Sequence, residues 1–277
     1  MAGARGAAAR WARAADGARI AYDVAGAGDD AILLISPLAG SRALWGAFRD
    51  QLAAHARVIA FDHRGLGESS SASLRTTTRD LARDAVAVLD DAGVERVHVF
   101  GSSLGGMVAT WLAADAAPRV RRLVLASTLA RGLSFARSGR AALRGARLAT
   151  CAVRGDRALG RCLADGLLTD AFQAANPREA ERIADEIARA PRSRRSLLWL
   201  AAAAARHDAR AALPGIVAPT LVLRGALDPL VAAAAQRRDF ADLHDVAFET
   251  IAAAGHALAL EAPAVVPARI LGFFAAG

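Results

Sequence analysis

The sequence predicts an α/β fold: a mostly parallel sheet flanked by helices, with an inserted helical cap. Short apolar runs alternate with helix-like stretches from about residue 30 onward, a pattern typical of parallel βαβ units. The alternation stops between residues 131 and 213, where the chain is rich in alanine and arginine, and then resumes. We therefore expect a core formed by residues 1–130 and 214–277, and a cap or lid formed by residues 131–213.

The apolar runs of the core are short enough to be strands buried on both faces of a sheet. They are Ala31–Ile35, Val58–Phe61, Val97–Phe100, Leu123–Leu125 and Leu221–Leu223, with a last strand expected at Val246–Ile251. Before them, Trp11–Ala14 and Ala18–Val24 predict an antiparallel hairpin that turns at Asp16-Gly17.

Helical spacing of apolar residues predicts the helices that connect these strands. The expected helices are Arg42–Ala54, Thr77–Ala92, Leu104–Ala114 and a closing helix after Pro263. Threonines 76 to 78 supply side chains that can cap the second of them.

The charge of the chain does not predict a nucleic-acid partner. The formal net charge is +8, but all 35 basic residues are arginine and there is no lysine. Together with the excess of alanine, this favours a compositional bias of the genome over a selected polyanion-binding surface. No nucleic-acid-binding motif accompanies the charge.

The chain has few features of a secreted or membrane protein. Cys151 and Cys162 do not form a metal-ligand pattern, and one pair is too sparse for a disulfide scaffold, so a reducing compartment is expected. The N-terminus has no apolar run typical of a secretory signal, and the longest apolar run, Leu197–Ala205, is too short to span a membrane. We expect a cytoplasmic protein without a membrane partner.

Gly101-Ser102-Ser103-Leu104-Gly105 matches G-x-S-x-G at the junction between a predicted strand and a predicted helix. Small residues allow a sharp turn that holds the serine hydroxyl above the end of the sheet. The start of the following helix favours developing negative charge. Ser103 is therefore the candidate nucleophile, although a serine here can also be a simple helix cap.

A serine hydroxyl needs a base to accept its proton, and His256 is the candidate. It lies in the loop after the last predicted strand, and Gly255 leaves the backbone free to present it. The other histidines lie at positions that predict no shared site: His55, His63, His98, His207 and His244.

The acid that orients the histidine is predicted to be Asp228. It follows the strand-like run at 221–223 and the glycine turn at Gly225, so it lies at the end of another strand. The chain order Ser103, Asp228, His256 is the order of nucleophile, acid and base in enzymes with this elbow motif.

Several sequence motifs, taken in their order along the chain, resemble those of a known superfamily. The sequence resembles the α/β-hydrolase superfamily over nearly its whole length, from DGARIAYDVAG through LAGSRALW, FDHRGLGESS, GSSLGGMVA and PTLVLRGALDPL to GHALALEAP. Within that superfamily it is most similar to 3-oxoadipate enol-lactonases and related esterases. The FDHRGLGESS segment is interpreted as a structural turn whose charged residues brace neighbouring loops.

The resemblance also implies where an oxyanion would be held. Family members commonly have His-Gly before the first donor, whereas this chain has Ser36-Pro37. Because Pro37 has no N–H, the resemblance implies the backbone N–H of Leu38 as one donor and that of Leu104 as the other.

The predicted cap has an arginine-rich segment. Between residues 131 and 161 there are eight arginines and one acid, and Arg137, Arg140, Arg144 and Arg147 recur at helical spacing. This stripe is either a solvated face or a surface that binds an anionic substrate or an acidic acyl-carrier protein. Trp199 is a further candidate for substrate binding.

These residues predict a serine hydrolase that cleaves a small carboxylic ester or lactone through an acyl-enzyme, without metal or organic cofactor. Three alternatives stay open: a carbon–carbon hydrolase or perhydrolase, a biosynthetic enzyme that cyclises or transfers the acyl group, and a non-catalytic ligand receptor. Serine at the elbow argues against haloalkane dehalogenases and epoxide hydrolases. The absence of an HGGPG-like stretch argues against proline iminopeptidases.

Overall fold

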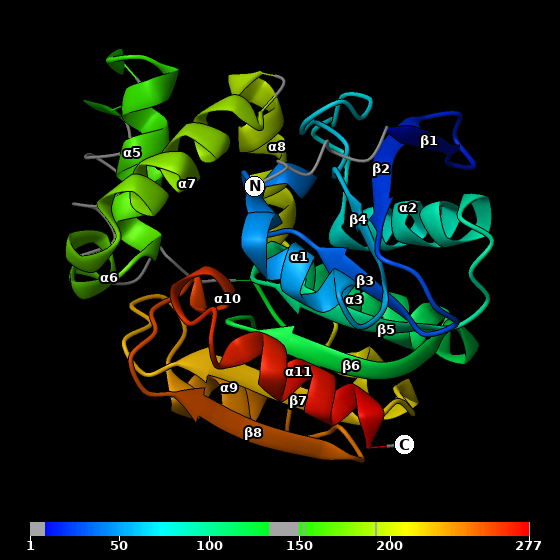
Figure 1. The fold of residues 1–277 in the computed structure, drawn as a ribbon. Helices are drawn as coiled ribbons and strands as arrows, with labels where there is room; N and C mark the ends of the chain where they lie inside the picture. The colour runs from blue at the N-terminus through cyan, green and yellow to red at the C-terminus, as the bar shows by residue number, and fades with distance from the viewer. Residues whose placement is uncertain (1–8, 133–149, 152, 192, 277) are drawn as a thin grey trace.

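The computed structural model of the chain describes residues 9–132, 150, 151, 153–191 and 193–276. Its eight-stranded sheet has the order β1-β2-β4-β3-β5-β6-β7-β8 (Figure 1). The strands are β1 (Arg10–Arg13), β2 (Arg19–Ala25), β3 (Ala31–Ile35), β4 (Arg57–Phe61), β5 (Val97–Ser102), β6 (Val120–Ala126), β7 (Thr220–Gly225) and β8 (Val246–Ile251). Each predicted strand is present, and β3 and β8 have the predicted bounds.

Most of the sheet is parallel, as predicted. Strand β2 pairs antiparallel with β1 and with β4, while every pair from β4 to β8 along the sheet is parallel. The carboxyl ends of β3, β5, β6, β7 and β8 therefore meet at one edge. Crossover connections place the loops that follow these strands at the same edge, where ligands of open α/β sheets bind.

The four helices predicted for the core are present, with bounds that differ by a few residues from the predictions. They are α1 (Gly46–Ala53) with the 3-10 turn η1 (Arg42–Trp45), α2 (Thr78–Asp91), α3 (Leu104–Asp115) and α11 (Val266–Ala275). The core also contains elements that were not predicted: α9 (Ala233–Asp239), α10 (Leu258–Glu261) and the 3-10 turns η2 (Ala117–Arg119) and η4 (Arg210–Gly215). The predicted helix 42–54 is divided because Gly46 has a φ of 42°.

Two apolar layers hold the helices against the sheet. Helices α2 and α3 cover one face, where Leu81, Val88 and Val108 are buried. Helices α1 and α11 cover the other, where Phe48 and Ile270 are buried (Figure 1). Both faces of the central strands are thus removed from water, which explains why their sequences are continuous apolar runs.

A capping box fixes the start of α2. The Thr77 side chain accepts a hydrogen bond from the backbone N–H of Asp80, and the Asp80 carboxylate accepts one from the N–H of Thr77. Two amides that the helix leaves unpaired are thereby satisfied, which stabilises a helix by about 1 kcal/mol per cap. The predicted threonine cap is confirmed at Thr77.

The segment between β6 and β7 contains α5 (Asp156–Leu167), α6 (Asp170–Ala175), α7 (Pro177–Arg189) and α8 (Arg194–Ala205). Figure 1 shows these helices gathered beyond one end of the sheet. They share an apolar cluster with the core loops after β3 and β8: Leu168, Phe172 and Ile183 are buried in it, and so are Ala39 and Leu44. This contact brings the inserted helices next to the edge where the strands end.

Cys151 and Cys162 are joined by a disulfide within this inserted segment. The pair is separated by 11 positions in the sequence, and the second cysteine lies on α5. No disulfide scaffold was expected from a single pair of cysteines, and this one bond stays within the inserted segment. No helix among the residues that the structure describes is long and apolar enough to cross a membrane.

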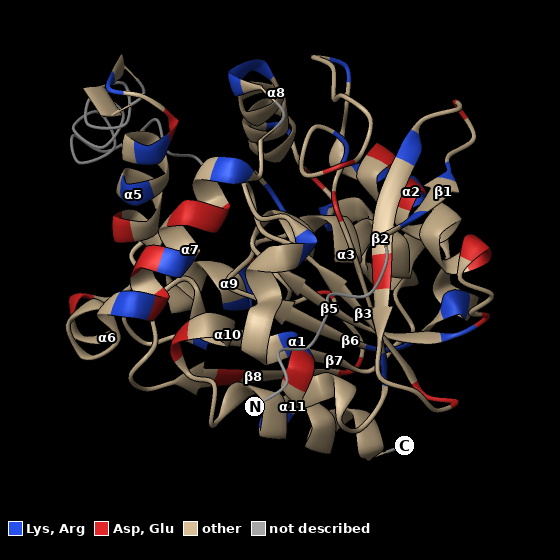
Figure 2. Cartoon of the chain, turned by 45° about the horizontal axis from the view of Figure 1, so that its top comes forward, with Lys and Arg blue, Asp and Glu red and all other residues tan. Residues whose placement is uncertain are grey.

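Charges on the inserted helices are mixed. Figure 2 shows basic and acidic positions side by side on α7. Arg157 of α5 pairs with Glu181 and Asp185 of α7, and Arg161 pairs with Asp165. Acidic side chains of α7 therefore partly balance the positive charge of residues 131–161, although α7 itself lies outside that range of the sequence.

Candidate active site

Ser103 lies at a strained turn between β5 and α3. Its φ is 54° and its ψ is −116°, a backbone conformation that costs a non-glycine residue about 1–3 kcal/mol. The backbone on both sides stabilises this turn: the Ser103 N–H donates to the Ala126 carbonyl at 2.9 Å, and its carbonyl accepts from Gly106 and Met107. The turn leaves the side chain at the carboxyl end of the sheet and partly accessible.

The two glycines of the motif are required by close backbone approaches. A Cβ atom on Gly101 would lie 2.4 Å from the Gly105 carbonyl oxygen. A Cβ atom on Gly105 would lie 2.0 Å from the carbonyl oxygen of Ile35, the last residue of β3. Glycine at both positions thus allows the start of α3 to contact the end of β3, where the predicted oxyanion loop begins.

The three predicted residues are hydrogen-bonded in one line. His256 Nε2 lies 2.9 Å from Ser103 Oγ, and His256 Nδ1 lies 3.0 Å from each carboxylate oxygen of Asp228. A carboxylate only accepts hydrogen bonds, so Nδ1 carries the proton and Nε2 is left as the acceptor for the serine hydroxyl. This is the tautomer in which the imidazole can act as a base.

Asp228 is held as a charged group. Burial raises the pKa of its carboxyl, but the hydrogen bond from His256 and those from the backbone N–H groups of Leu230 and Val231 outweigh this effect. The net result is a pKa below the ordinary value for aspartate. Asp228 is therefore ionised at neutral pH, and its charge would stabilise a protonated imidazole at His256.

The backbone amides of Leu38 and Leu104 belong to the two segments that meet where Gly105 contacts Ile35 and Ser36. Leu104 is the first residue of α3, so its N–H has no acceptor within the helix. Neither amide donates to an acceptor in the part of the chain that the structure describes. The loop that carries Leu38 continues through Ala39, whose φ is 61°.

Arg42 anchors the far end of this loop. Its backbone N–H donates to Asp62 Oδ1 at 2.7 Å, and its guanidinium pairs with Asp62 and Glu68, both in the segment FDHRGLGESS. Arg64 of the same segment donates from Nε to Asp84 at 2.7 Å. These ion pairs connect the segment to η1 and to α2, in agreement with a structural role for its charged residues.

Four further histidines lie in separate surroundings. His63 bonds to the Ser36 carbonyl, His98 stacks on Phe274, His207 bonds to Thr78 Oγ1, and His244 bonds to the Pro214 carbonyl. None of these contacts reaches Ser103. Across the described ranges there is also no group of three or more His, Cys, Asp or Glu side chains that could hold a metal ion.

The predicted cap residues are not brought to this site by any described contact. Arg137, Arg140, Arg144 and Arg147 lie outside the described residues. Trp199 lies on α8 and is partly buried. The binding roles assigned to these residues therefore remain predictions.

Two residues of the site were missed by the sequence analysis. Thr128, after β6, donates from Oγ1 to the Ser103 carbonyl at 2.8 Å. Glu261 accepts a hydrogen bond from Gly255, the neighbour of His256. Their positions in the sequence could have suggested a place near the site: Thr128 follows the strand next to the Ser103 turn, and Glu261 lies five residues after His256.

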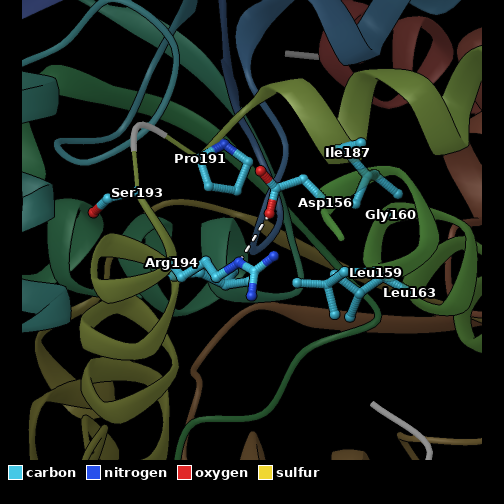
Figure 3. A pocket seen from close by; sticks show the side chains of 10 residues that line it. Asp156, Leu159, Gly160, Leu163, Ile187, Pro191, Ser193 and Arg194 are labelled. Atoms are coloured by element: carbon cyan, nitrogen blue, oxygen red, sulfur yellow. Dashed lines mark hydrogen bonds and ion pairs between the residues drawn. The ribbon is translucent and has the colours of Figure 1, made fainter. Parts of the chain in front are cut away.

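A cavity of about 90 Å³ lies inside the inserted segment, between α5, the end of α7 and the start of α8 (Figure 3). Figure 3 shows apolar side chains on one side and the Arg194–Asp156 ion pair on another. Leu163 and Leu197 line the cavity and also pack against the apolar cluster that contains Ala39. An apolar layer therefore extends from the loop after β3 to this cavity.

Comparison with known proteins agrees with this geometry. Residues 30–263 match the family described as "alpha/beta hydrolase fold". The chain belongs to the α/β-hydrolase fold family. The predicted fold class and the resemblance stated from the sequence are thereby confirmed.

The relatives of this α/β-hydrolase are named as hydrolases. A protein of Variovorax paradoxus, provisionally named carbamate hydrolase RutD, is 36% identical over 92% of this chain and 95% of its own length. The 3-oxoadipate enol-lactonase 1 of Acinetobacter baylyi is 27% identical over 72% of each chain. A hydrolase structure from Pseudomonas aeruginosa PA01 superposes with a TM-score of 0.82 at 30% identity, covering 97% of this chain and 98% of the other. The prediction that this protein is a hydrolase is confirmed.

Proposed function

We propose that this hydrolase cleaves a carboxylic ester or lactone through an acyl-enzyme formed on Ser103. The observation that carries the proposal is the continuous line of hydrogen bonds from Ser103 Oγ through His256 to Asp228. Nucleophile, base and orienting acid are the three parts that acyl transfer to serine requires.

In the first half of the reaction, Ser103 Oγ attacks the substrate carbonyl carbon while His256 Nε2 takes the hydroxyl proton. The carbonyl electrons move to oxygen, and the N–H groups of Leu38 and Leu104 hold this oxyanion. When the intermediate collapses, the bond to the leaving alcohol breaks, and that alcohol takes the proton from Nε2. In a lactone the alcohol stays attached to the acyl group.

In the second half, His256 Nε2 takes a proton from water, and the resulting hydroxide attacks the acyl carbon. Collapse breaks the bond to Ser103 Oγ, which recovers its proton from Nε2, and the carboxylic acid leaves. None of these steps calls for a metal or an organic cofactor.

The segment 131–213 is proposed to form a cap that binds the acyl part of a small-molecule substrate. The apolar cluster that the inserted helices share with Ala39 and Leu44 of the core supports this role, because it holds them next to the edge of the sheet where Ser103 lies. An anionic substrate or an acidic carrier protein would instead require the arginine stripe at 137, 140 and 144.

Cleavage of a carbamate is the second candidate. It is supported by the relative from Variovorax paradoxus, which matches over nearly the whole of both chains. The same serine attack and the same oxyanion donors apply, because a carbamate also presents a carbonyl carbon bonded to a leaving group.

The test is labelling with a fluorophosphonate probe, followed by assays with p-nitrophenyl esters of graded acyl length, simple lactones and an aryl carbamate. We expect the probe to modify Ser103, identified by mass spectrometry, and no labelling of Ser103→Ala. Ser102→Ala is the matched control because it removes the neighbouring hydroxyl. Labelling that persists in Ser103→Ala would exclude the mechanism, and the fastest substrate class would separate the two candidates.

A further inference from the structure

The loop that carries His256 is tied on both sides of the histidine. Before it, the Gly255 N–H donates to Glu261 Oε1 at 3.0 Å. After it, the Ala257 N–H donates to the Leu167 carbonyl at 3.3 Å. Leu167 ends α5, so one of these bonds reaches directly into the inserted segment.

Glu261 makes a second contact with that segment. Its other oxygen, Oε2, accepts a hydrogen bond from the Thr169 N–H at 2.8 Å, and Thr169 caps α6. Both carboxylate oxygens are therefore used to hold backbone amides from two different loops.

There is little free space between these groups. A Cβ atom on Gly255 would lie 2.9 Å from Glu261 Oε1, 3.0 Å from Thr169 Cγ2 and 3.3 Å from the Leu167 carbonyl oxygen. On its other side, the loop contacts β7: a Cβ atom on Gly225 would lie 2.2 Å from the Gly255 carbonyl oxygen. The backbone before His256 is thus enclosed between the Asp228 loop and the α5–α6 junction.

We propose that Glu261 is a positioning residue for His256, and that its carboxylate clamps the histidine loop to the α5–α6 junction. The inference rests on the proposed role of His256 as base. Glu261 contacts no reacting atom in this scheme and acts only through the backbone of Gly255. Its removal should let the imidazole depart from its alignment with Ser103 Oγ, and a displacement of about 1 Å in a catalytic group can cost about 10²-fold in rate.

The experiment measures kcat and KM for p-nitrophenyl acetate in Glu261→Ala and Glu261→Gln. We expect Glu261→Ala to lower kcat by about 10- to 100-fold with little change in KM, because this small ester needs few cap contacts. Glu261→Gln should lose less, since one amide oxygen can still accept one of the two hydrogen bonds. Glu249→Gln is the matched control, because Glu249 pairs with Arg269 and does not contact the histidine loop.

Two further measurements separate positioning from a general loss of structure. The low-field proton NMR signal of the His256 Nδ1–H shared with Asp228 should shift or broaden in Glu261→Ala and stay unchanged in Glu249→Gln. In a His256→Ala background, Glu261→Ala should have no additional effect on kcat, because the two residues act as a unit.

The contact with Thr169 can be tested separately. Thr169 has a φ of −73°, which suits proline, so Thr169→Pro removes the N–H donor at little backbone cost. Thr169→Ala removes the capping hydroxyl but keeps the N–H, and it is the matched control. We expect kcat to fall in the proline variant and to be largely kept in the alanine variant. Equal rates in the two would overturn the clamp to α6.

The two proposals fail in distinguishable ways. If His256→Ala kept wild-type activity, the proposed function and this inference would both be wrong. If His256→Ala were inactive while Glu261→Ala kept the wild-type kcat and NMR signal, only the positioning role of Glu261 would be wrong.

Discussion

His63 donates a hydrogen bond from Nε2 to the Ser36 carbonyl oxygen, 2.9 Å away, at the fully buried base of the loop that carries Leu38. The donor must be Nε2 because a carbonyl only accepts. Burial outweighs this hydrogen bond and the nearby Asp62 charge, and it lowers the pKa of His63 from 6.5 to about 4. The imidazole is therefore neutral in the folded protein.

This burial predicts a loss of stability in acid. The unfolded chain binds a proton at His63 below about pH 6.5, while the folded protein does not until about pH 4. The contribution of His63 to the free energy of unfolding is therefore fully present above pH 6.5, and it is lost as the pH falls from 6.5 to 4. At pH 5 the His63 contribution to the free energy of unfolding should have fallen by about 2 kcal/mol.

Urea unfolding at pH 7 and pH 5 checks this expectation. His63→Gln keeps a side-chain N–H donor but does not titrate, so its stability should fall less between the two pH values. The exposed histidine His55 supplies the control: His55→Gln should follow the wild type. An unchanged pH dependence in His63→Gln would contradict the prediction.

Gly105→Ala should damage the oxyanion donors more than the fold. The new Cβ atom would meet backbone oxygens of Ile35 at 2.0 Å and Ser36 at 2.7 Å, which cannot rotate away. The end of β3 must then move from the start of α3, separating the amides of Leu38 and Leu104. We expect kcat to fall by about 10²- to 10³-fold, the usual effect of losing an oxyanion donor.

The control for this variant is Gly272→Ala. Gly272 lies in α11, and a Cβ atom there would have no neighbour within 4 Å. It should keep wild-type kcat, whereas a Gly105→Ala enzyme with wild-type kcat would show that the contact with Ile35 does not position the donors.

Ser103→Ala, His256→Ala and Asp228→Asn should each lower kcat/KM by about 10⁴-fold or more without unfolding the protein. In Asp228→Asn the amide can donate to Nδ1, which would move the imidazole proton to Nε2 and remove the acceptor for Ser103. Because the three residues act as a unit, double variants should be little worse than single ones. Thermal unfolding checks the fold, and additive losses would argue against one catalytic line.

The activity should fall as the medium becomes acidic. His256 accepts the serine proton only in its neutral form, so kcat/KM should rise with pH through a single ionisation. Asp228, whose pKa lies below its ordinary value, should stay ionised across this range. A profile of kcat/KM from pH 5 to 9 under conditions where chemistry limits the rate checks this, and a flat profile would count against His256 as base.

The arginine stripe predicts a charge-dependent effect on substrate binding. Converting Arg137, Arg140 and Arg144 to glutamine should raise KM for an acidic ester and weaken its salt dependence, with kcat for a neutral ester unchanged. Arg189→Gln, at a surface ion pair with Glu186, is the control. An equal effect on both esters, or none on either, would identify the stripe as a solvated face.

The strands of the core were predictable because burial on both faces of the sheet requires a continuous run of apolar residues in the sequence. Apolar runs such as Ala31–Ile35 are buried at every position, and the same bounds were found in sequence and structure. The order of Ser103, Asp228 and His256 was predictable because each follows its own strand or helix signal. Gly105 likewise had a recognisable place in a motif.

Contacts between segments that are far apart in the chain have no local sequence pattern that would predict them. Nothing in the sequence around Glu261 indicates that it meets Thr169, since the two are 92 positions apart. The acids of α7 that pair with Arg157 lie beyond residue 161, so the local excess of arginine does not indicate them. The division of the helix at Gly46 depends on a positive φ that periodicity does not report.

The hydrogen bond between Ser103 and His256 joins residues that are 153 positions apart. Between them in the chain lie three strands of the sheet, β6, β7 and β8, and the whole inserted segment, so a nascent chain lacks its base until β8 and the loop after it have emerged and docked. Closing so large a loop is entropically costly, and contacts of this span form late in the folding of a parallel sheet. Catalytic competence is therefore a property of the finished molecule: a partly folded intermediate that has assembled β1 to β6 carries an exposed nucleophile elbow that is chemically inert.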